Sequence, residues 1–137
     1  MVFDTTVLYC AVVTRQRGPS RRLLSCSRLR IIKGVGSTYI LNELRRALIE
    51  KRWSPSTVEG VIERVKEALE IMDPPAEVLD MVKGVCRDPE DDPILALAKL
   101  VKADFIATHD KDLLDLGEFE GARILKPQNI LGLLGIG

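Results

Sequence analysis

The chain has 137 residues, of which 46% are hydrophobic and 29% charged, and its formal net charge at pH 7 is zero. This length fits one globular domain spanning residues 1–137, and no hydrophobic run reaches the roughly 18 residues that a membrane span requires. No charged leader precedes a hydrophobic segment, and the three cysteines form no CxxC pair, so neither secretion nor a disulfide framework is indicated. We therefore expect a cytoplasmic protein with no membrane segment.

The first half of the chain predicts alternating strands and helices. A hydrophobic run at the N-terminus predicts a short strand that ends near Asp4 and is followed by a helix. Residues 20–26 have the pattern of a short helix, and the β-branched run 29–35 that of a strand. Two amphipathic helices follow, at 37–51 and 54–72, and each begins with a serine at the N-cap position.

The second half continues this alternation. Short or buried helices are predicted at 77–83 and 92–102, a buried strand at 103–107, another strand at 121–125 and a last helix at 127–134. Strands separated by helices favour the α/β class, here a three-layer α/β/α sandwich with a mostly parallel central sheet. In such sheets, ligands bind beyond the carboxyl ends of the strands.

Charge is unevenly distributed along the chain. Residues 1–68 contain 13 Lys and Arg against 6 acids, whereas residues 69–137 contain 7 against 14. The early basic stretch includes four arginines that are candidates for binding RNA phosphates: Arg15, Arg17, Arg21 and Arg22. An acidic partner peptide would suit the same stretch. The two charged faces could also simply be solvated and attract one another.

Several acids fall where a parallel sheet would gather them. Asp4 and Asp110 each follow a predicted strand, while Asp91 and Asp92 precede the helix at 92–102. Glu43 lies among the apolar positions of its helix, where an unpaired charge costs several kcal/mol. The ordinary alternatives are that Asp92 caps its helix and that Glu43 forms an ion pair with a neighbouring arginine.

Carboxylates that converge in one pocket repel one another and retain protons unless a cation joins them. Mg²⁺ and Mn²⁺ prefer such oxygen ligands, whereas zinc prefers His or Cys, and the chain has one histidine, His109. A carboxylate-bound metal beside a basic stretch is typical of an enzyme that acts on phosphodiesters.

Four segments together resemble the PIN-domain family. They are residues 4–8 (DTTVL), 37–44 (STYILNEL), 87–98 (RDPEDDPILALA) and 108–114 (THDKDLL). They occur in order and with the expected spacing over essentially the whole chain. Within the family, the chain is most similar to the toxins of prokaryotic toxin–antitoxin pairs.

The resemblance implies a Mg²⁺- or Mn²⁺-dependent ribonuclease that hydrolyses RNA with a metal-activated water. It further implies a homodimer and a possible antitoxin partner. The metal-binding and catalytic quartet carried over from the family is Asp4, Glu43, Asp91 and Asp110, with accessory positions at Asp112, Thr108, Asp92 and Thr6. A shift of one residue would exchange Asp91 and Asp92.

Two other functions fit part of the sequence. A PIN module that has lost catalysis would bind RNA or protein without cleaving. Asp4 and Thr6 also partly match the nucleophile motif of haloacid-dehalogenase-type phosphatases, but Leu8 breaks that match and only Lys83 is available as the required lysine.

Overall fold

A six-stranded sheet forms the centre of the computed structural model, which describes residues 1–136. The strands are β1 (Val2–Phe3), β2 (Val35–Gly36), β3 (Glu70–Ile71), β4 (Phe105–Ala107), β5 (Glu118–Phe119) and β6 (Ala122–Leu125). They follow the order β3-β2-β1-β4-β6-β5. All neighbours pair in parallel except β5, which runs antiparallel to β6. The predicted mostly parallel sheet is therefore confirmed.

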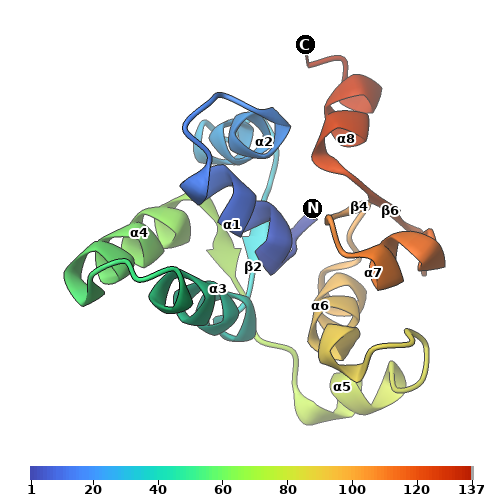
Figure 1. Cartoon of the computed structure of the whole chain (residues 1–137). Helices are drawn as coiled ribbons and strands as arrows, with labels where there is room; N and C mark the ends of the chain where they lie inside the picture. Colours follow the sequence, from blue (N-terminus) through green and yellow to red (C-terminus); the bar gives the residue numbers. More distant parts are fainter. Residues whose placement is uncertain (137) are drawn as a thin grey trace.

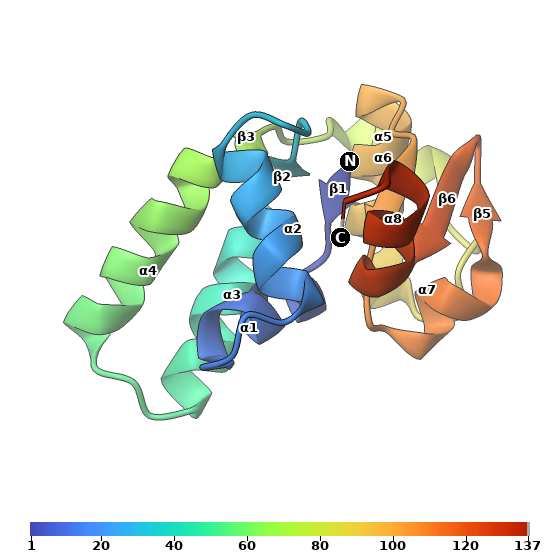
Figure 2. The ribbon, with the colours of Figure 1, turned by 90° about the horizontal axis from the view of Figure 1, so that it is seen from above.

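Helices cover both faces of this sheet. They are α1 (Thr5–Val13), α2 (Pro19–Arg28), α3 (Thr38–Glu50), α4 (Pro55–Ala68), α5 (Ala76–Met81), α6 (Asp92–Val101), α7 (Lys111–Leu116) and α8 (Pro127–Leu134). Figure 1 shows α1–α4 grouped on one side of the N-terminus and α5–α7 on the other. Helix α8 contacts α2 and β4, and α6 contacts α5 and β1; Figure 2 shows α8 in front of α6, with β1 on one side of them and β6 on the other. The predicted α/β/α sandwich is confirmed.

The strand order places two strand ends side by side at the centre of the sheet. Strands β1 and β4 pair in parallel, with Phe3 opposite Ala107, so Asp4 and Thr108 leave the sheet at the same edge. From β1 the chain proceeds outward to β2 and β3, then returns to place β4 on the other side of β1. This reversal of strand order is the position where open α/β sheets bind ligands.

Two of the predicted elements are wrong in their extent. Of the predicted strand 29–35, only its last residue belongs to β2. Residues 29–32 form a turn after α2, where Arg30 has φ of 63° and the amide of Ile31 donates to the carbonyl of Cys26 at 2.9 Å. Leu29 and Ile31 are 69% and 61% exposed, so the start of this hydrophobic run stays outside the core, whereas Val35 at its end is buried.

The helix predicted to reach residue 72 ends at Ala68 instead. Residues 70–71 form the edge strand β3, because the amides of Glu70 and Met72 donate to the carbonyls of Gly34 and Gly36. Their strand partner lies more than thirty residues earlier in the chain. Helix α7 and strand β5 were not predicted, because both are short and their hydrophobic patterns are weak.

The remaining helices agree with the sequence. Ser37 and Ser54 cap α3 and α4, accepting from the amides of Ile40 and Thr57 at 3.2 and 3.3 Å. Helix α8 has the predicted bounds. Within residues 1–136, no helix is both long and apolar enough to cross a bilayer. Of the predicted domain, Gly137 lies outside the described residues.

Candidate metal centre at the carboxyl edge of the sheet

Asp4 is a buried carboxylate with a fixed orientation. Its backbone amide donates to the carbonyl of Ala107 at 3.0 Å, which continues the β1–β4 pairing by one residue. Its Oδ2 accepts hydrogen bonds from Thr6 Oγ1 at 2.8 Å and Thr108 Oγ1 at 2.7 Å. Both threonines predicted as accessory positions therefore contact the same carboxylate oxygen.

The loop after β4 is tied to the loop after β1. Thr108 is fully buried, and its hydroxyl accepts from the amide of Asp110 at 2.9 Å while donating to Asp4. The amide of His109 donates to Thr6 Oγ1 at 2.9 Å. Asp110 then caps α7, because its Oδ1 accepts from the amide of Asp112 at 2.8 Å. These bonds hold Asp4 and Asp110 at neighbouring strand ends.

Asp91 approaches this edge from the short 3₁₀ helix Pro89–Asp91, directly before α6. Its side chain is buried, with 6% exposed, and its Oδ2 accepts from the thiol of Cys86 at 3.6 Å. Burial, followed by the charges of Asp110, Asp4 and Asp88, raises the pKa of Asp91 to about 7. Asp91 therefore lies within the electrostatic field of both strand-end acids.

Asp4 is subject to the same opposing effects. Burial raises its pKa, the hydrogen bonds from Thr108 and Thr6 lower it, and the nearby charge of Asp110 raises it again. Within residues 1–136, no ion pair compensates Asp4, Asp91 or Asp110. Buried carboxylates without a counter-charge are costly, and a divalent cation with oxygen ligands would remove that cost. The residues present therefore fit a Mg²⁺ or Mn²⁺ ion.

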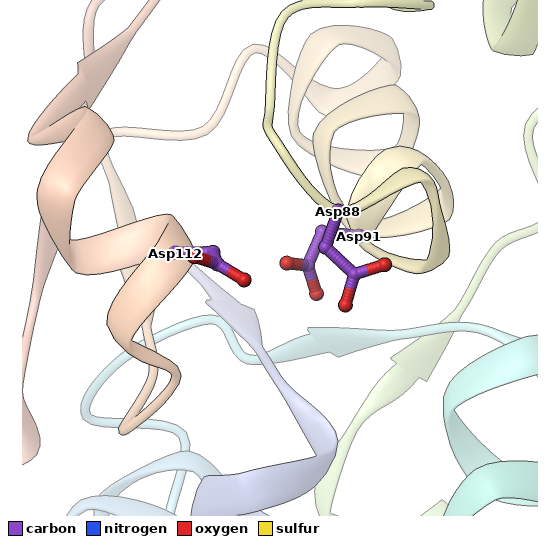
Figure 3. Close-up of side chains that lie close together, drawn as sticks. All are labelled: Asp88, Asp91 and Asp112. Atoms are coloured by element: carbon purple, nitrogen blue, oxygen red, sulfur yellow. The ribbon is translucent and has the colours of Figure 1, made fainter.

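A second grouping shares Asp91. One carboxylate oxygen each from Asp88, Asp91 and Asp112 lies within 4.8 Å of the others, a set that could hold a metal ion (Figure 3). Asp112 is also paired with Arg87, whose Nη2 lies 2.9 Å from Asp112 Oδ1. Asp88 was not among the predicted site residues, because Asp before Pro indicates a turn. It does form one, accepting from the amide of Glu90 at 2.9 Å.

Glu43 lies farther out on α3. Its side chain is 29% exposed and pairs with Arg46 at 2.7 Å, which is the structural alternative that the sequence left open. Its charge and that of Asp91 both act on the hydroxyl of Tyr39. Burial and the charges of Glu43, Glu90 and Asp91 together raise the pKa of Tyr39 to about 12. Glu43 is therefore a partly exposed acid whose charge acts on the same tyrosine as that of Asp91.

Asp92 does not cap α6. It is the first helical residue, and Asp91 takes the N-cap position without a side-chain hydrogen bond. Among the residues of the structure up to 136, Asp92 Oδ1 is a buried oxygen without a hydrogen-bond partner. The N-cap interpretation was wrong because the 3₁₀ turn begins the helix one residue earlier than the proline suggests.

Two of the four arginines predicted to bind phosphates, Arg17 and Arg21, line a cavity apart from the acidic site. A cavity of about 400 Å³ between α1, α2 and α4 is lined by Arg17, Arg21, Arg28, Arg64 and Trp53 over an apolar floor. Arg21 Nε donates to the carbonyl of Ala11 at 3.2 Å, so this side chain holds the α1–α2 connection. Arg15 and Arg22 are exposed and do not line the cavity. None of the acidic site residues lines it either.

Comparison with known proteins identifies the fold and the family. The toxin VapC20 of Mycobacterium tuberculosis, whose crystal structure is described as that of a Sarcin-Ricin loop cleaving toxin, has a similar fold. Its TM-score is 0.64, with 16% identity over 88% of this chain and 98% of that one. None of the curated proteins matches this chain. The sequence matches the family described as PIN domain over residues 1–112. The chain belongs to the PIN-domain family.

Proposed function

We propose that this protein is a Mg²⁺- or Mn²⁺-dependent ribonuclease that cleaves RNA phosphodiesters internally. The observation that carries the proposal is the buried, uncompensated Asp4 carboxylate, held by two threonine hydroxyls beside Asp110 and Asp91. Burial of like charges is costly for the fold and is typical of functional sites. A bound divalent cation would supply the positive charge that keeps these acids ionised and activates water for attack on phosphorus.

Each residue of the acidic site has a role in this proposal. Asp4, Asp91 and Asp110 would hold the cation, and Thr6 and Thr108 fix the orientation of the Asp4 carboxylate. Asp112 and Asp88 adjoin Asp91 and extend the negative field toward Arg87. Glu43, which is partly exposed on α3, would orient water or a second ion. Asp91 is favoured over Asp92 as the ligand, because Asp91 shares the field of Asp4 and Asp110.

We further propose that the protein is the toxin of a toxin–antitoxin pair and forms a homodimer. VapC20, which has the same fold, is described as a toxin that cleaves the Sarcin-Ricin loop. The arginine-lined cavity would receive the antitoxin. Its apolar floor and its rim of four arginines suit an amphipathic segment that carries acidic residues.

The proposal is tested with a labelled single-stranded RNA incubated with Mn²⁺, Mg²⁺ or EDTA. Wild-type protein is expected to cleave only with metal, and Asp4→Asn is expected to fold normally and lose at least 100-fold in rate. The matched control is Asp104→Asn, an exposed acid at the opposite end of β4. Full metal-dependent cleavage by a folded Asp4→Asn protein would contradict the assignment of the site.

The two alternatives give different results. A PIN module without catalysis would bind RNA in EDTA and gain no thermal stability from Mg²⁺ or Mn²⁺. A phosphatase of the haloacid-dehalogenase type would hydrolyse a phosphomonoester and form an aspartyl-phosphate on Asp4. Hydrogen bonding of Asp4 by two hydroxyls, with the charges of Asp110 and Asp91 nearby, favours the ribonuclease.

A further inference from the structure

A second hollow of the surface begins at the acidic site. It lies between α1 and α3 and encloses about 490 Å³. Its lining residues come from two helices: Thr5, Thr6, Tyr9, Ala47, Glu50 and Lys51. We refer to it as the α1–α3 groove. Its volume falls within the roughly 300–1,000 Å³ of small-molecule sites.

The α1–α3 groove is continuous with the candidate metal centre. Thr6 lines the groove, and its hydroxyl donates to Asp4 Oδ2 at 2.8 Å. On the other wall, Ala47 lies one helical turn after Glu43, so both are on the same face of α3. In an RNA strand cleaved at Asp4, the nucleotide next to the scissile phosphate would therefore lie over this groove.

The chemistry of the groove matches a nucleotide. Tyr9 is half-buried and packs against the core, so its ring is held in a fixed position. Ala47 opposite it is small and leaves room for a flat base. Lys51 at the far end is an exposed cation that can meet a phosphate. Bases stack on aromatic rings with little sequence preference, and phosphates bind lysine.

The cavity between α1, α2 and α4 is the competing location, since it combines Trp53 with four arginines. However, it shares no lining residue with the α1–α3 groove or with the acidic site. A base bound there would not be the neighbour of a phosphate at Asp4. Continuity with the acids therefore favours Tyr9 over Trp53 as the stacking residue.

We propose that the α1–α3 groove is the subsite for one unpaired nucleotide beside the cleaved bond, with its base stacked on Tyr9 and a phosphate at Lys51. The proposal rests on the proposed ribonuclease function and narrows its substrate. A base in a duplex is stacked on both sides and cannot enter the groove, so cleavage requires a loop or a single strand.

Photocrosslinking tests this subsite without depending on cleavage. The full-length protein is illuminated in EDTA with a short single-stranded RNA that contains 5-iodouridine, and the adducts are mapped by mass spectrometry. We expect the main adduct on Tyr9 and a much weaker signal when the same RNA is annealed to its complement. Absence of an adduct on Tyr9, or adducts only on Trp53, would overturn the proposal.

Kinetics then separate the subsite from the metal centre. Tyr9→Leu is expected to raise KM for single-stranded RNA about tenfold, while Tyr9→Phe, which keeps the ring, restores most of the affinity. Lys51→Ala should raise KM, and Lys66→Ala, the same change of charge on α4, should not. An unchanged KM in a folded Tyr9→Leu protein would overturn the subsite alone. A Tyr9 adduct without any wild-type cleavage would leave the subsite standing and overturn the ribonuclease.

Discussion

Replacing Asp91 by asparagine is expected to stabilise the metal-free protein at neutral pH while abolishing its response to metal. The pKa of Asp91 is raised from 3.8 to about 7, first by burial and then by the charge of Asp110. One pKa unit corresponds to about 1.4 kcal/mol, so the shift corresponds to about 4 kcal/mol between the two protonation states. Solvent at the open edge and proton sharing among the neighbouring acids reduce the measurable effect to about 1–3 kcal/mol.

The direction of the pH dependence follows from the raised pKa. Between about pH 4 and pH 7, folded Asp91 retains a proton that the unfolded chain has already lost, so the folded state binds more protons. The contribution of Asp91 to stability is therefore full below pH 4 and is lost as the pH rises toward 7. Because Asn carries no charge, Asp91→Asn removes this loss.

Thermal unfolding in EDTA, followed by circular dichroism from about pH 5 to pH 8, measures this effect. In a domain of this size, 1 kcal/mol shifts the Tm by about 3–5 °C. We expect the Tm of the wild type to fall relative to that of Asp91→Asn as the pH rises, and Mn²⁺ to raise the wild-type Tm alone. Asp104→Asn is the control. Parallel pH profiles, or an equal gain from Mn²⁺ in the variant, would refute the reasoning.

Three further substitutions test the surroundings of the site. Thr108→Val removes the donor to Asp4 and the acceptor of the Asp110 amide, and should cost about 1–3 kcal/mol in urea unfolding, most of which Thr108→Ser should recover. Ser37→Ala removes the N-cap of α3 and should cost about 1 kcal/mol, with no change in metal affinity. Glu43→Gln should lower cleavage at least tenfold yet change stability by only about 0.2–0.5 kcal/mol, whereas Arg46→Gln, which breaks the same ion pair, should leave cleavage intact. Equal cleavage rates for Glu43→Gln and Arg46→Gln would mean that Glu43 acts only through its ion pair with Arg46.

Local signals predicted much of the fold. Serine caps and the period of the apolar residues located α3 and α4, and the chain position of α8 was predicted to the residue. The strand at 29–35 was mostly wrong because a short β-branched run cannot by itself be told from an exposed hydrophobic turn. The end of α4 failed because β3 exists only through its pairing with β2, and a local pattern carries no information about a partner that far away.

The acidic site divides in the same way. The sequence alone predicted that Asp4 and Asp110 lie at the carboxyl ends of strands, because each follows a predicted buried strand. Asp88 was missed because a turn-forming aspartate before proline looks the same whether or not its carboxylate meets others. Only the course of the chain from β3 back to α6 brings Asp88 and Asp91 within 4.8 Å of Asp112.

The sequence by itself determined the class of fold, the caps of its main helices and the set of acids from which a metal centre could be built. These depend on residue type and spacing over a few turns. Tertiary structure decided which acids meet, because parallel pairing of β1 with β4 joins segments about a hundred residues apart. It also decided that two threonines orient Asp4, that Glu43 pairs with Arg46, and that a groove leads from Thr6 to Tyr9. Burial then raises the pKa of Asp4 and of Asp91, which no spacing along the chain predicts.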